Sequence, residues 1–123
     1  MNELIKTIFT GFTVDGKPIP VSYMFYEGHG EPYVTYMNVE MNNSLSGDNE
    51  LLGYIAYYDF DVYSKGNYTK IIESIKTLLK QNGFVFQPSR CSEDMYETDT
   101  GYFHKTLNFA YIISEVENGE NRT

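Results

Sequence analysis

The residues best suited to chemistry in this sequence are two aspartates and a histidine. Asp59 and Asp61 lie two positions apart in a segment of alternating polar and apolar residues, and His104 lies in a second such segment. Alternate residues of a strand point to the same face, so both carboxylates share a face, and His104 joins them if the two strands are neighbours. Two carboxylates and an imidazole can hold a divalent metal ion for phosphoryl hydrolysis. We favour the simpler interpretation that they form the solvated side of a half-buried sheet, because no further ligand motif accompanies them.

A second candidate is the polar stretch from Gln87 to Gly101. It contains one cysteine and four acidic residues, namely Cys91, Glu93, Asp94, Glu97 and Asp99. Carboxylate-rich loops bind calcium, but this spacing is not that of an EF-hand. No nearby base would activate the Cys91 thiol as a nucleophile. We therefore interpret the acidic residues as a solvated loop.

The third candidate is the short sequence Gly28-His29-Gly30. It is too short for a phosphate-binding loop, and it lacks the lysine and the serine or threonine of that motif. The sequence predicts a turn here, with His29 exposed.

Helices and strands with clear periodicity position these candidates. Apolar residues at helical spacing predict one helix from Asn2 to Phe9 and another between Asn67, a suitable N-cap, and Gly83. Alternation predicts strands at Ile19–Tyr26, Tyr33–Met41, Leu52–Val62, Phe84–Phe86 and Tyr102–Ile113. The first two of these strands are expected to form a hairpin around the turn at Gly28–Pro32.

The order of these elements predicts a single α+β domain over residues 1–113. We expect a mainly antiparallel sheet of about four to five strands, with two helices packed on one face and the other face open to water or to a neighbour. The segment from Asn42 to Glu50 is predicted to project as a loop. The segment from Gln87 to Gly101 is either a projecting loop or a poorly paired excursion. Residues 114–123 are predicted to form a polar, disordered tail.

The composition bears on partners and on location. The chain carries 17 acidic and nine basic side chains, for a net charge of -8, so it is poorly suited to tight binding of nucleic acid. The chain has 12 tyrosines, a residue type that is enriched at protein interfaces. A single cysteine cannot form an internal disulfide, and no apolar run predicts a signal peptide or a membrane span. The sequence therefore predicts a protein made in the cytoplasm, without membrane insertion.

Several motifs together are similar to a known family. They are Asp59-Phe-Asp-Val-Tyr-Ser-Lys-Gly-Asn-Tyr68 before the second helix, Gly83-Phe84 after it, Gly16-Lys-Pro-Ile-Pro-Val21, Glu31-Pro-Tyr-Val34 and Thr98-Asp-Thr-Gly-Tyr-Phe-His-Lys-Thr106. In these motifs the chain resembles the tail-completion, or head-tail connector, proteins of long-tailed phages and prophages of Gram-positive bacteria. The likeness covers most of the chain and leaves the extreme termini unmatched. It implies an α+β subunit of a ring at the end of the tail tube or at the neck below the portal.

The resemblance implies partners and a location as well. The partners would be further copies of the chain, the tail tube protein and the neck or connector proteins, and the location would be the virion after synthesis in the host cytoplasm. We expect the contacts to involve Leu45, Asp48, Asp59, Asp61 and His104. An acidic ring would let DNA slide through without holding it.

Two other functions stay open at this point. The chain could be a small protein-binding adaptor or inhibitor that uses an exposed sheet edge. A metal-dependent hydrolase built on the two aspartates and His104 is the third candidate. We expect an assembling protein without catalytic residues, metal or cofactor.

Overall fold

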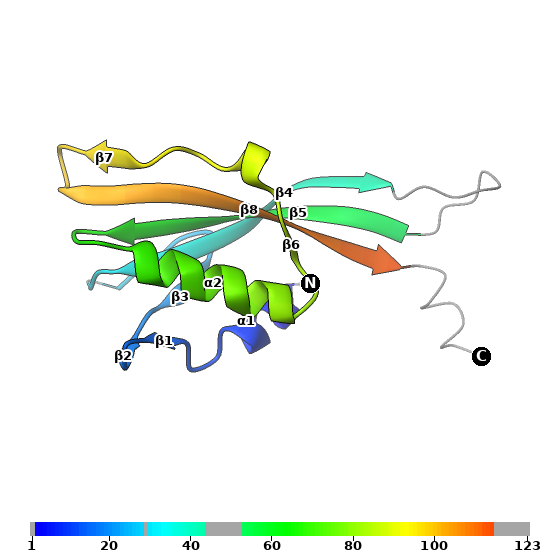
Figure 1. Ribbon diagram of the computed structural model, residues 1–123, viewed down its shortest axis with the longest axis horizontal. Helices are drawn as coiled ribbons and strands as arrows, with labels where there is room; N and C mark the ends of the chain where they lie inside the picture. The colour runs from blue at the N-terminus through cyan, green and yellow to red at the C-terminus, as the bar shows by residue number, and fades with distance from the viewer. Residues whose placement is uncertain (1, 29, 44–52, 115–123) are drawn as a thin grey trace.

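The computed structural model describes residues 2–28, 30–43 and 53–114. Figure 1 shows the order of the elements along the chain. They are α1 (Asn2–Ile8), β1 (Thr13–Val14), β2 (Lys17–Pro18), β3 (Val21–Tyr23), β4 (Tyr33–Asn43), β5 (Gly53–Ser64), α2 (Thr69–Gln81), β6 (Val85–Phe86), a 3-10 turn η1 (Pro88–Arg90), β7 (Met95–Glu97) and β8 (Tyr102–Ser114). Within these ranges, no helix has the length and apolar character needed to cross a membrane.

One mixed sheet organises the fold, which confirms the predicted α+β class. Its strands follow the order β3-β4-β5-β8-β6, and β7 pairs with β8 as well. Neighbouring strands are antiparallel except for β3 and β4, which are parallel. The sheet has six strands, and β1 and β2 form a separate two-stranded sheet, so the predicted four to five strands were too few. β7 accounts for the difference, because it lies in a polar stretch without alternation and pairs with β8 through its backbone.

The predicted hairpin between the first two strands is wrong. β3 lies parallel to β4, with Val21 opposite Val34 and Tyr23 opposite Tyr36. It is also shorter than predicted, because Met24 adopts a φ of 68°, a conformation that turns an L-residue out of a strand. The amide of Phe25 then donates to the carbonyl of Tyr23 at 2.8 Å. The chain leaves the sheet at this tight turn.

The second helix agrees closely with its prediction except at its start, where the N-cap is Tyr68 and the predicted cap, Asn67, lies one residue before it. The Asn67 side chain accepts a hydrogen bond from the amide of Thr69 at 2.9 Å, which satisfies one of the unpaired donors at the start of α2. Beyond the last turn, Gly83 has a φ of 87°, which glycine adopts at little cost. The side chains that α2 buries recur at helical spacing, and they are Ile71, Ile72, Ile75 and Leu79.

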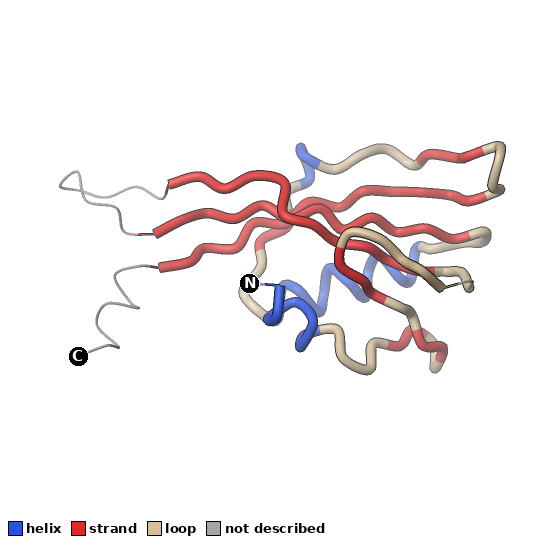
Figure 2. Tube along the Cα trace, turned by 180° about the vertical axis from the view of Figure 1, so that it is seen from behind, coloured by secondary structure: helices blue, strands red, loops and turns tan. Residues whose placement is uncertain are grey.

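Both helices lie on the same side of the sheet (Figures 1 and 2). The side chains of β5 and β8 that face them are fully or almost fully buried, including Phe60, Val62, Leu107 and Phe109. Ile5 of α1 and Ile75 of α2 belong to the same core cluster and contribute the helical side of it. Burial of these apolar side chains is the main source of stability, at about 1.5–3 kcal/mol for each large one. We call this side of the sheet the covered face and the other side the open face.

The stretch from Gln87 to Gly101 does not project, which settles the alternative left by the sequence. It runs along the edge of β8 through η1 and β7. The amide of Ser92 donates to the carbonyl of Thr106 at 3.0 Å, and the amide of Thr106 donates to the Ser92 hydroxyl at 2.8 Å. Polar composition predicted a loop, but these contacts use backbone groups and a serine hydroxyl and need no apolar side chains.

At one end of the molecule β4, β5 and β8 continue past the helices, as Figures 1 and 2 show. We call this end the arm, and define it as Glu40–Asn43, Gly53–Tyr57 and Ala110–Ser114. β4 includes residues 42–43, which were predicted to begin a loop, and β8 includes Ser114, which was predicted to begin the tail. The remainder of the predicted loop and tail lies outside the described residues.

Candidate functional site

The open face brings together the three residues that the sequence singled out. β5 and β8 are neighbours, and their register sets Tyr63 opposite His104, Asp61 opposite Thr106 and Asp59 opposite Asn108. The condition for His104 to join the two aspartates is therefore met. Alternation along the strands places all six of these side chains on the open face.

Asp61 is the centre of a small hydrogen-bonded cluster. Its Oδ1 lies 3.0 Å from Nε2 of His104, and it also accepts a hydrogen bond from the Thr106 hydroxyl. The side chains of His104 and Asp61 are only 17% and 19% exposed. On its other side, Nδ1 of His104 lies 3.8 Å from Oε2 of Glu97 on β7. The imidazole thus links three strands, and both of its nitrogens face carboxylates.

Asp59 has a partner of its own. Nδ2 of Asn108 donates to Oδ1 of Asp59 at 2.7 Å. Burial raises the pKa of the Asp59 carboxyl, the hydrogen bond from Asn108 opposes that rise, and the negative charge of Asp61 adds to it. Asn108 is itself 1% exposed, and its Oδ1 has no hydrogen-bond partner among the described residues. The two aspartates therefore have different hydrogen-bond partners, His104 and Thr106 for Asp61 and Asn108 for Asp59.

A metal site does not follow from this arrangement. In the part of the chain that the structure describes, no three His, Cys, Asp or Glu side chains are placed to hold a metal ion together. The Asp61 oxygen nearest His104 is already an acceptor for two side chains. The geometry therefore supports a structural role for these carboxylates.

A row of stacked rings crosses the open face next to the Asp61 cluster. Tyr26 stacks on Tyr33 with ring centroids 4.7 Å apart, Tyr33 stacks on Tyr63 at 4.7 Å, and Tyr63 stacks on His104 at 4.2 Å. The Tyr102 ring meets Tyr33 and Tyr63 edge-on. We call the four stacked residues the aromatic row. Stacked and edge-on rings stabilise each other beyond their buried area, so the row holds a fixed shape.

Burial and negative charge also suppress ionisation within the aromatic row. Burial raises the pKa of Tyr63 to about 12, and the charge of Asp61 contributes to the shift. The pKa of Tyr33 is raised as well, first by burial and then by the nearby Tyr102 and Glu97. A tyrosine hydroxyl is protonated at neutral pH even at its ordinary pKa of 10, and the raised pKa values extend this to more alkaline solution. Both hydroxyls can therefore donate hydrogen bonds to a partner. The sequence contained a signal for the row in tyrosines at facing strand positions, but no signal for which rings would stack.

A second contact on the open face was not predicted. Arg90 extends from η1, and its guanidinium carbon lies 4.0 Å from the centroid of the Tyr57 ring on β5. The same guanidinium pairs with the carboxylate of Glu40 on β4. This pairing lowers the pKa of Glu40 and raises that of Arg90. The partners are fifty positions apart in the sequence, so no local pattern could have indicated the contact.

The other sequence candidates are dispersed or lie elsewhere. Leu45 and Asp48, which were expected to make contacts, are outside the described residues, as is His29. The thiol of Cys91 lies 3.3 Å from the carbonyl of Gln87, at the start of the segment beside β8. Among the nearby acids, Asp94 accepts a hydrogen bond from the Tyr68 hydroxyl. These contacts support a structural role for the acidic segment.

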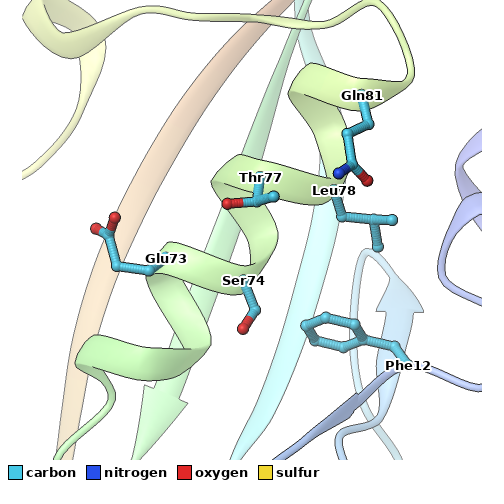
Figure 3. Close-up of a pocket in the computed structure, with 6 residues that line it drawn as sticks. All are labelled: Phe12, Glu73, Ser74, Thr77, Leu78 and Gln81. Atoms are coloured by element: carbon cyan, nitrogen blue, oxygen red, sulfur yellow. The ribbon is translucent and has the colours of Figure 1, made fainter.

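The hollow in Figure 3 lies on the opposite side of the molecule, between Phe12 and α2. It has a volume of about 390 Å³. Figure 3 shows the Leu78 side chain and the Phe12 ring near each other, with the Glu73 carboxylate directed away from the ring. The lining residues are mostly those of one exposed helix surface and include no base beside the Ser74 hydroxyl. This hollow is a shallow packing feature.

A roomier hollow of about 720 Å³ lies between the β1–β2 pair and the start of α2. Its two cations already have neighbours, because Lys70 pairs with Asp15 at 3.0 Å and Lys17 donates to the carbonyl of Glu31 at 3.5 Å. Positive and negative side chains thus balance around it.

Comparison with models of known protein families gives no match, and no curated protein sequence is similar enough to count as a match. Membership of the phage tail-completion family therefore stays a proposal.

Proposed function

We propose that this chain is a structural protein that completes the tail tube of a long-tailed phage and joins it to the head. Further copies of the chain would form the ring, and the tail tube protein and the neck proteins would bind it. The observation that carries the proposal is the open face, where the polar and aromatic side chains are fixed by one another. Such a surface is suited to recognition of a protein partner and poorly suited to turnover of a substrate.

The aromatic row gives this surface the character of a protein interface. Tyrosine buries a large area at small entropic cost and keeps a hydroxyl for a hydrogen bond. Tyr33 and Tyr63 are already held in place by stacking, so a partner would not have to order them. This preorganisation favours repeated contacts between identical subunits.

The charge of the chain is compatible with a passage for DNA. The net charge is -8. On the open face Glu40 pairs with Arg90, Asp61 and Glu97 both face His104, and Asp59 has only the neutral Asn108 as its hydrogen-bond partner. A predominantly acidic surface repels phosphates, so DNA would pass a ring of such subunits without binding to it.

The decisive experiment is quantitative mass spectrometry of purified particles from cells that carry this gene. We expect the chain to be present in a fixed ratio to the portal protein that corresponds to one ring. Absence from intact particles would overturn the proposal. A variable or trace amount would count against it too, because a ring subunit is stoichiometric.

A matched pair of variants tests the open face within the same system. Met37→Lys places a charge on the open face, where Met37 is 36% exposed opposite Asp59. Gln81→Lys places the same charge at the exposed end of α2. We expect Met37→Lys to lower the yield of joined particles and Gln81→Lys to leave it unchanged. Equal yields of joined particles from the two folded variants would show that the open face is not part of the contact surface.

One observation favours the alternative of an adaptor or inhibitor. Part of β4 lies beyond the end of β3, so its outer edge is unpaired within the described ranges. Such an edge can accept a strand from a different protein. Capture of a single host protein by a chain that stays out of particles would support this alternative. Among the described residues, no group of side chains placed to hold a metal ion supports the metal-dependent hydrolase.

A further inference from the structure

The arm has two unpaired strand edges. β3 pairs with β4 only as far as Tyr36, and no strand among the described residues pairs with the outer edge of β4 from Met37 to Asn43. On the opposite side, β6 pairs with Phe109 and Ala110. Within the same ranges, Ile112–Ser114 of β8 has no neighbour on that side. Unpaired amide and carbonyl groups of this kind are a template for another strand.

Few of the usual protections against strand addition are present at the edge of β4. Natural edge strands are often blunted by lysine, proline or a bulge, and residues 37–43 contain neither lysine nor proline. The one irregularity lies between Asn38 and Glu40, after which pairing with β5 continues regularly to Asn43. Val39 and Met41 are 44% and 49% exposed there. The stretch Glu40–Asn43 is therefore a regular and partly apolar edge.

We propose that Glu40–Asn43 of one copy pairs with Ile112–Ser114 of the next copy, which extends the sheet from subunit to subunit. This inference rests on the proposed function and specifies how its copies join. β4 and β8 are both antiparallel to β5, so they run in the same direction within one copy. A head-to-tail repeat that keeps the open face on the same side therefore makes the new pair parallel. The pair of β3 and β4 is already of this type.

The side chains favour this pairing over a symmetric pairing of two β4 edges. An antiparallel β4–β4 pair that overlaps Val39 with Met41 sets Glu40 opposite its own copy, and like charges directly opposite are destabilising. The edge of β8 instead presents Ile112, which is 62% exposed, and no charged residue between Ile112 and Ser114. A contact between two different edges also repeats around a closed ring, whereas a two-fold contact ends at a dimer.

Cysteine cross-linking tests the junction directly. Asn42 on β4 and Ile112 on β8 both lie directly opposite Ile55 of β5, one on each side of it. Both therefore belong to the open face of the arm. Asn42→Cys and Ile112→Cys are made as separate variants in a Cys91→Ser background, because in one copy both positions flank Ile55 and a linker could join them within a monomer. Equal amounts of the two variants are mixed at high protein concentration and treated with a flexible bis-maleimide, and we expect a cross-linked dimer. Each variant alone should stay monomeric on the same gel.

The single-cysteine variants also identify the competing arrangements. A strong dimer from Asn42→Cys alone would overturn the proposal in favour of a symmetric β4 contact. A dimer from Ile112→Cys alone would overturn it in favour of a β8 contact. Absence of any cross-link would exclude this edge even if particles contain the chain in a ring ratio. Failure of the edge pairing is thus distinguishable from failure of the proposed function, which the composition of particles decides.

Hydrogen exchange of the unmodified protein provides a test that needs no variant. We expect the amides of 40–43 and 112–114 to gain protection as the protein concentration rises, because pairing satisfies them. Met41→Lys should abolish the gain, whereas Met95→Lys, at an exposed position of β7 that is 41% exposed, should retain it. Concentration-dependent protection confined to other segments would contradict the junction.

Discussion

The covered face and the open face of the sheet are made by the same strands, yet they are held together in different ways. On the covered face, Phe60 and Phe109 pack in edge-to-face contact at 5.6 Å and are almost fully buried. On the open face, Asp61 and Tyr63 of the same β5 strand are fixed by hydrogen bonds and stacking at partial exposure. Apolar packing contributes most of the stability, while the polar contacts fix the shape of a surface. Changes on the two faces should therefore have separable effects.

The largest effect is expected from a change on the covered face. Phe60→Ala removes a ring that is 0% exposed and contacts Phe9, Tyr36 and Phe109. The cavity should lower the free energy of unfolding by about 3–5 kcal/mol, measured by chemical denaturation. A loss no larger than that of an open-face variant would contradict the comparison between the faces.

An intermediate effect is expected at the centre of the polar cluster. Asp61→Ala leaves His104 and Thr106 without their common acceptor, and water can replace it only in part. The free energy of unfolding should fall by about 1–2 kcal/mol. Thr106→Val is the matched control, since it removes a single bond and should cost less in the same denaturation measurement. Equal losses would show that His104 gains nothing from Asp61.

A smaller effect, of opposite sign, is expected from Asp59→Asn. The pKa of Asp59 is raised in the folded state above its ordinary 3.8, chiefly by burial, so the folded protein holds this proton more tightly than the unfolded chain. The stabilising contribution is complete below pH 3.8 and is lost as the pH rises through the folded pKa. The neutral asparagine should therefore raise the melting temperature at pH 7. Melting curves should show this gain shrink toward pH 3.8, and a gain independent of pH would exclude the explanation.

The smallest effect on stability is expected from Arg90→Ala. The pair of Arg90 and Glu40 is well exposed, and exposed ion pairs contribute little. The melting temperature should change less than in Asp59→Asn, but amide exchange in η1 should become faster because its anchor on Tyr57 is lost. A large loss of stability would show that contacts on the open face also contribute to the stability of the fold.

The elements of the covered face could be predicted from the sequence because their periodicity is strong. Ile71, Ile75 and Leu79 recur at helical spacing, and the alternation around Phe60 assigned each side of β5 correctly. The same alternation placed Asp59, Asp61 and His104 on one face. These features follow from local patterns that one buried surface imposes.

The pairing of short segments and the contacts across the open face could not be predicted. Alternation in β3 is equally compatible with parallel and antiparallel pairing, and the turn at Met24 has no clear sequence signal. β7 pairs through its backbone inside a polar stretch. The contact between Arg90 and Glu40 joins segments that are distant in the sequence. Such features depend on the assembled fold.

The long register of β5 between β4 and β8 has a mechanical consequence. β5 is paired on both sides along almost its whole length, so a pull directed along the strands shears two ladders of hydrogen bonds at once. A pull across the strands would instead open those bonds one after another. The subunit should therefore resist tension best along the direction of its strands.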